Sequence, residues 1–189
     1  MEFPPPSSTA ASVAAIDFGS WTALPLSVDG PLRDASRATA EALFATLVQA
    51  QPARCAALVT LAKHNHVEIS NVATAAAAAA LGAWLKPRLP RTFGPADPRG
   101  YGLATDIALW IGSGIIANAP QVHWQLLTSH KNSTGYQRAV LTGFSRVDAP
   151  HYYVDVAHFV ATWVDYAIRQ RAAREDFLTT IYATTLADA

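Results

Sequence analysis

The sequence predicts an α+β fold that is mostly helical, with a small antiparallel sheet packed on the helices. Three observations carry this prediction. Apolar residues recur at helical spacing over much of the chain, two short alternating segments lie at about 122–127 and 139–144, and a polar connection at 128–137 joins them. Two strands alone are marginal in water, so we expect this sheet to need helices against one face.

The chain begins with a stretch that predicts a tail. Residues 1–15 are dominated by Pro, Ser, Thr and Ala, which bury too little apolar surface to offset the entropy of ordering, so a flexible tail is expected. Residues 16–189 then form one α+β domain. Residues 13–28, which overlap the end of the tail, alternate between small apolar and polar types, which predicts an extended segment lying on the body that could add a strand.

Residues 31–86 predict a helical part. Asp34 is expected to cap a helix that runs to about Gln49, and Pro52 to begin a second helix. Ser70 or Asn71 can cap a third helix, which ends before Pro87. The inward face of the first helix is expected to hold five apolar residues at helical spacing: Ala40, Leu43, Phe44, Leu47 and Val48.

Residues 87–102 are rich in Pro and Gly and predict a loop between the helical part and a helix–hairpin–helix part at 103–189. The two parts could be separate or share one core. The later part opens with a helix at about 103–118, followed by the hairpin, a helix at about 152–171 and a short helix for which Asp176 is the expected cap. The 103–118 helix has a broad apolar face made of Leu103, Ile107, Trp110, Ile111 and Ile115.

Two further expectations concern packing. Gly112 and Gly114 each cost a helix about 1 kcal/mol relative to alanine, which predicts a close contact with another backbone or a kink. Trp110, Trp124 and Trp163 come from the two helices and the first strand, and are expected to form a shared apolar centre.

Composition excludes some function classes and favours others. The 14 basic residues balance 14 acidic ones, so the chain has no basic excess for nucleic acid. The opening residues lack the pattern of a secretory signal, and the longest apolar run, 72–85, is too short to span a bilayer, so we expect a cytoplasmic protein with no membrane association. Charged residues make up 15% of the chain, which leaves apolar surface for another protein or a second copy to cover, unless alanine richness accounts for it.

The order of elements in residues 103–169 resembles a loose group of uncharacterised bacterial α+β domains. The matching residues are packing residues: Leu109-Trp110, Gly112, Ile115, Trp124, Val140-Leu141-Thr142-Gly143-Phe144, Pro150, Val154 and Val160. Some domains of that group look like immunity proteins or accessory proteins of bacterial conflict and secretion systems. The resemblance covers about a third of the chain and implies a protein-binding role, but it carries over no catalytic residues.

Several residues could carry chemistry. Asp17-Phe18-Gly19-Ser20 resembles the first phosphate-binding motif of actin-like and Hsp70-like ATPases, although the chain is about half the length that such ATPases need. His64 and His66 could share a metal with Glu68, or could belong to a polar helix end. Asp155 and His158 lie three residues apart on a helix, as a carboxylate that orients a catalytic imidazole would.

Two remaining predictions concern packing and partners. Cys55 beside Arg54 could be a reactive thiol, but its neighbours favour a core residue. Side chains around the hairpin and the following turn predict a partner-binding cluster or an ordinary polar rim: Tyr136, Arg146, His151, Tyr152 and Tyr153. The sequence therefore predicts a non-enzymatic protein-binding module without a cofactor; a small hydrolase and a homo-oligomer assembled through the Ala-rich helix at 72–85 are the alternatives.

Overall fold

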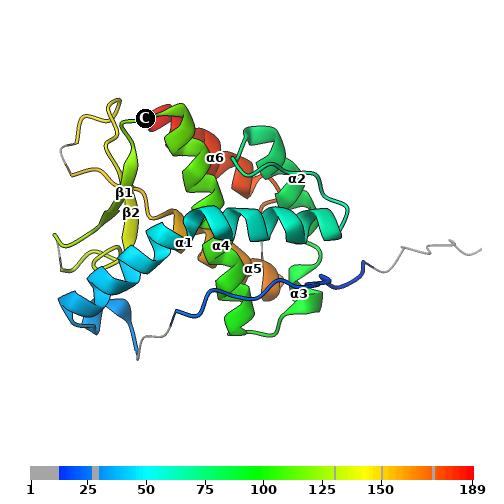
Figure 1. The fold of residues 1–189 in the computed structure, drawn as a ribbon. Helices are drawn as coiled ribbons and strands as arrows, with labels where there is room; N and C mark the ends of the chain where they lie inside the picture. The colour runs from blue at the N-terminus through cyan, green and yellow to red at the C-terminus, as the bar shows by residue number, and fades with distance from the viewer. Residues whose placement is uncertain (1–12, 27–29, 130, 150, 172) are drawn as a thin grey trace, which may run out of the picture.

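The computed structural model describes residues 13–26, 30–129, 131–149, 151–171 and 173–189, and confirms a mostly helical α+β fold (Figure 1). A 3₁₀ turn, η1 (Leu32–Asp34), precedes α1 (Arg37–His64), α2 (Ala75–Leu85), α3 (Leu89–Thr92) and α4 (Pro98–Asn118). The hairpin of β1 (His123–Leu126) and β2 (Ala139–Thr142) follows, and α5 (Val156–Ile168) and α6 (Phe177–Asp188) end the chain. Much of the expected tail, residues 1–12, lies outside the described residues.

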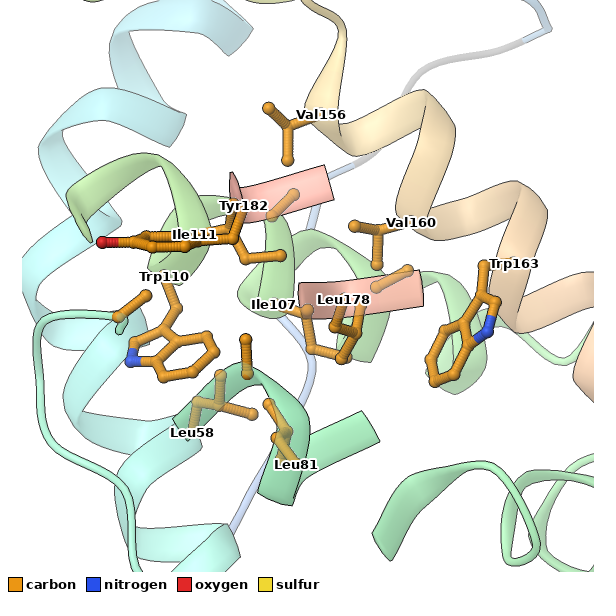
Figure 2. Packing of buried hydrophobic residues seen from close by; sticks show 14 of the residues in the cluster. Leu58, Leu81, Ile107, Trp110, Ile111, Val156, Val160, Trp163, Leu178 and Tyr182 are labelled. Atoms are coloured by element: carbon orange, nitrogen blue, oxygen red, sulfur yellow. The ribbon is translucent and has the colours of Figure 1, made fainter. Parts of the chain in front are cut away.

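Helix α4 lies at the centre of the fold. Its expected apolar face is fully buried, and α4 packs against both α1 and α5, while α2 packs against α6. One buried cluster contains residues of the helical part, such as Leu58 and Leu81, and of the later part, such as Ile107 and Leu178 (Figure 2). The regions before and after residues 87–102 therefore share a core.

The three tryptophans belong to this packing but do not meet at one centre. Trp110 and Trp163 are buried, and Figure 2 shows them on opposite sides of Ile107 and Leu178. Trp124 is half-buried and lies on α4, where a Cβ at Gly112 would come 2.2 Å from its ring. A Cβ at Gly114 would come 2.4 Å from the carbonyl oxygen of Ala73. The predicted close contact with another backbone is thus confirmed at Gly114, whereas Gly112 makes room for the side chain of Trp124.

The hairpin has the predicted antiparallel pairing, with His123 opposite Thr142 and Leu126 opposite Ala139. Trp124 and Leu126 turn toward the body, whereas His123 and Gln125 are exposed. A single bridge between Leu141 and Val154 extends the pairing on the other edge of β2. The described part of the 13–28 segment is extended but joins no strand, and it lies across the helices (Figure 1).

Several predicted boundaries were wrong. The two helices expected on either side of Pro52 are one helix, α1, which Ser36 caps in place of Asp34. Proline removes one helical hydrogen bond and crowds the preceding turn, and Figure 1 shows the first part of α1 running at an angle to the second. Thr74, rather than Ser70 or Asn71, caps α2.

The later part contains two more boundary corrections. Helix α4 begins inside the expected loop, because Asp97 caps it and Pro98 fits its first turn. Helix α5 begins at Val156 rather than near Tyr152, because Asp155 caps it and Val154 still pairs with β2.

Candidate functional site

The outer face of the hairpin forms a groove, here called the hairpin groove, with a volume of about 780 Å³. His123, Gln125 and Thr142 form its floor, and the Thr142 hydroxyl donates to Gln125 Oε1 at 3.0 Å. Three residues of the predicted partner-binding cluster, His151, Tyr152 and Tyr153, line this groove. Tyr136 and Arg146 are not among its lining residues, so the structure brings together only part of the cluster.

The two tyrosines of the hairpin groove are held in place by hydrogen bonds. The Tyr152 hydroxyl donates to Asp188 Oδ2 at 2.7 Å, and its ring meets the edge of Phe144 at 5.2 Å between centroids. Burial and the bond to the Asp188 carboxylate raise the pKa of Tyr152 to about 12. The Tyr153 hydroxyl is hydrogen-bonded to the Ser133 hydroxyl. Both rings can therefore contact a partner with little further loss of rotamer entropy.

Asp155 and His158 do not form the carboxylate–imidazole pair that a hydrolase of this kind needs. Asp155 is buried; its Oδ1 accepts from the backbone N–H of His158 at 2.8 Å and its Oδ2 accepts from Arg138 Nε at 2.6 Å. The carboxylate thus caps α5 and does not orient the His158 imidazole. That imidazole is exposed beside a hollow of about 420 Å³ that Arg138 also lines.

His64 pairs with Asp17 rather than with His66. His64 Nε2 lies 2.9 Å from Asp17 Oδ2 on the surface, while His66 is exposed with a φ of 61°. Among the described residues, no group of three or more His, Cys, Asp or Glu side chains is placed to hold a metal ion.

The residues of the phosphate-type motif, Asp17 to Ser20, also form a hydrogen bond within the motif. The backbone N–H of Gly19 donates to Asp17 Oδ1 at 3.0 Å, and this bond together with His64 lowers the pKa of Asp17. The glycine N–H that would contact a phosphate is therefore used by the side chain two residues earlier.

Sequence reasoning missed a buried network around Asp106. This carboxylate is fully buried on α4; its Oδ1 accepts from Arg54 Nε at 2.7 Å and its Oδ2 accepts from the Trp21 indole at 2.8 Å. Burial raises the pKa of Asp106, and the Arg54 guanidinium and the Trp21 indole oppose that shift. One signal was available, because Asp106 is the only charged residue between Leu103 and Asn118.

This network anchors the segment of residues 16–26, here called the strap, against α1 and α4. Arg54 Nη2 also donates to the carbonyl oxygen of Thr22 at 2.8 Å, and the Asn65 amide donates to the carbonyl oxygen of Asp17 at 2.7 Å. Between the strap and α1 lies a cavity of about 220 Å³, here called the strap cavity. Cys55, near this network, is buried, and burial raises the pKa of its thiol, which favours the predicted core role.

The first part of α1 carries the largest departure from the expected packing. Residues 41–53, here called the open half of α1, include no buried residue, and residues 42–53 carry no charge. Leu43, Phe44 and Leu47 are half-buried and Val48 is 37% exposed. By length and composition both α1 and α4 could cross a membrane, but 67% of the most apolar window of α4 is buried in the fold, against 11% of that of α1.

The chain matches no protein-family model, no curated protein and no solved structure in the comparisons with known proteins. Its buried network and its exposed surfaces are therefore the basis on which a function is inferred.

Proposed function

We propose that the protein is a non-enzymatic protein-binding module whose partner covers the open half of α1. The observation that carries this proposal is the uncharged stretch of residues 42–53, in which no residue is buried. A helix in a folded protein gains most of its stability by packing an apolar face, and apolar surface that the fold leaves uncovered marks interaction sites. Thr46 reduces the polarity of this surface further, because its hydroxyl donates to the carbonyl oxygen of Ala42 at 2.9 Å.

The hairpin groove supplies a second contact of different character. Tyr152 and Tyr153 present large rings whose hydroxyls are already bonded, and His123 and Gln125 supply polar groups beside them. Interfaces concentrate binding energy in such aromatic residues and take specificity from the polar groups around them. The open half of α1 thus provides apolar contact area, and the hairpin groove discriminates between partners.

The proposal extends to the kind of protein that is bound. The resemblance of residues 103–169 to immunity and accessory proteins supports a cytoplasmic role in a bacterial conflict system, with a toxin or a secretion component as the bound protein. A hydrolase is less well supported, because the Asp155 carboxylate caps α5 and bonds Arg138. A second copy of the chain remains the alternative partner for the open half of α1.

A matched pair of substitutions tests the proposal. Val48→Glu places a charge on the open half of α1, and Val72→Glu makes the same change at another exposed valine, which is 43% exposed. Each purified protein is used to capture binding proteins from host lysate. The wild type and Val72→Glu are expected to capture one protein in stoichiometric amount, and Val48→Glu is expected not to capture it, while all three melt at the same temperature. Equal retention by all three, or no stoichiometric protein with any, contradicts the proposal.

Light scattering on the purified proteins identifies the partner class. A wild-type dimer that Val48→Glu converts to a monomer assigns the surface to a second copy. A monomer in every case leaves a different protein as the partner of the open half of α1.

A further inference from the structure

The strap cavity has two kinds of wall. Aromatic rings of Phe18 and Trp21 lie on the strap side, with ring centroids 5.0 Å apart. On α1, Arg54 lies against Trp21, with its guanidinium carbon 5.7 Å from the ring centroid. The hydroxyl-bearing Thr60 and, near the end of the same helix, His64 complete this wall. Apolar rings with a few placed polar groups are typical of sites for small molecules.

Arg54 is held as a rigid donor at this cavity. Its Nε and Nη2 donate to the buried Asp106 carboxylate, and Nη2 donates also to the carbonyl oxygen of Thr22. Its Nη1 has no hydrogen-bond partner among the described residues. A guanidinium fixed by a buried carboxylate has already lost its rotamer entropy, so its remaining N–H groups can bind an acceptor at low further cost.

The charges around the cavity select the type of acceptor. Asp106 balances the charge of Arg54, so this ion pair leaves no net charge on the wall that it forms. The free donors of Arg54 require an acceptor oxygen and disfavour a cationic ligand. A neutral carbonyl oxygen and a carboxylate both meet this requirement.

The volume limits the size of the ligand. An apolar cavity of about 150 Å³ in another protein binds benzene, and sites for drug-sized ligands begin at about 300 Å³. At about 220 Å³, the strap cavity admits one ring with a small substituent.

We propose that the strap cavity binds a small planar aromatic molecule that carries a carboxamide or carboxylate, with its ring against Phe18 and Trp21 and its acceptor oxygen on Arg54 Nη1. This inference is independent of the partner proposed for the open half of α1. Benzamide and benzoate are the probes, and benzylamine, which has the ring but a cation in place of the acceptor oxygen, is the control.

The Trp21 indole N–H gives the signal, because it donates to the same Asp106 carboxylate that holds Arg54. In ¹H–¹⁵N spectra, benzamide and benzoate are expected to shift this resonance saturably with a Kd of about 1 mM, as suits a fragment of this size. Benzylamine is expected to bind at least about ten times more weakly. If neither benzamide nor benzoate gives a saturable shift, the proposal is overturned. If benzylamine binds as tightly as they do, the proposed role of Arg54 is overturned.

Substitutions of Arg54 would break a buried ion pair, so the matched variants change exposed threonines on helices instead. Thr60 on α1 lines the cavity and Thr184 on α6 does not; each donates to the carbonyl oxygen four residues earlier, at 2.9 and 2.8 Å. Thr60→Phe is expected to fill the cavity and weaken benzamide binding at least about tenfold, with Thr184→Phe unchanged and all proteins melting alike. Unchanged binding by a folded Thr60→Phe places the probe elsewhere and overturns the assignment.

Discussion

Arg54 on α1 and Asp106 on α4 form a buried ion pair, with Arg54 Nε 2.7 Å from Asp106 Oδ1, and Trp21 adds a third segment to it. The Asp106 side chain has no exposed surface, and that of Arg54 is 12% exposed. Three parts of the chain that are distant in sequence therefore meet at one carboxylate, and the position of the strap depends on it.

Removal of the carboxylate is expected to destabilise the fold strongly. Asp106→Ala leaves the Arg54 charge buried without its counter-ion, which should lower the free energy of unfolding by about 3–5 kcal/mol. Urea denaturation measures this loss. Asp176→Ala is the control, because its pair with Arg174 lies on the surface, and it should cost much less stability than Asp106→Ala. Similar losses for the two variants would contradict a structural role for the buried pair.

Features set by local periodicity could be predicted from the sequence. Leu103, Ile107 and Trp110 follow the helical repeat and are fully buried, and the alternation around Trp124 marks a real strand. Gly112 and Gly114 signalled close packing because a glycine inside a helix is costly unless space is short. In each of these cases the signal lies within one continuous segment.

Features that depend on distant partners could not be predicted. Asp106 bonds residues 52 and 85 positions away, and no spacing rule connects Trp21 with Arg54. The prediction for Asp155 failed for a different reason, although its partner His158 is close in sequence. Its spacing from His158 is compatible with both a side-chain pair and a helix cap. Arg138, which decides between them, lies just before β2.

Gly114 is expected to resist even the smallest enlargement. In an ordinary helix position, alanine would stabilise by about 1 kcal/mol, but here its Cβ would lie 2.4 Å from the carbonyl oxygen of Ala73. Gly114→Ala should therefore lower the free energy of unfolding by about 1–3 kcal/mol, measured by thermal or urea denaturation. Gly100→Ala, on the same helix, meets the flexible end of Ile168 at 3.3 Å and the Phe93 ring at 3.7 Å, which is an ordinary contact distance, and should be nearly neutral. A stabilised Gly114→Ala would show that α4 and Ala73 can separate freely.

Gln137 is expected to hold the start of α1 in place. It is buried, and its Nε2 lies within hydrogen-bond distance of the carbonyl oxygens of Leu32, Arg33 and Ala35, at 2.9, 3.2 and 3.0 Å. Gln137→Ala removes the bonds to these carbonyl oxygens, of which that of Leu32 keeps only its bond from the Ala35 N–H. The substitution should cost about 1–3 kcal/mol, with faster amide hydrogen exchange in η1 and the first turn of α1.

Gln170→Ala is a matched control, since Gln170 also has a left-handed backbone, with a φ of 53° against 61° for Gln137. Gln170 is exposed and makes no side-chain hydrogen bond to another described residue. Equal losses in the two variants would assign the effect to the backbone rather than to the carbonyl contacts.

Tyr152 is expected to make stability fall at high pH. Its folded pKa is raised from 10.0 to about 12, because of burial and then the bond to Asp188. The stabilisation from the neutral hydroxyl is thus fully present below pH 10 and is lost as the pH rises through about 12. Titration of the tyrosine ¹³Cζ resonances should assign this late ionisation to Tyr152, and the stability advantage over Tyr152→Phe should shrink in the same interval. Asp188→Asn removes the charged acceptor and should lower the pKa of Tyr152. A Tyr152 pKa near 10 in the wild-type protein would contradict the prediction, because it would mean that the hydroxyl does not donate to Asp188.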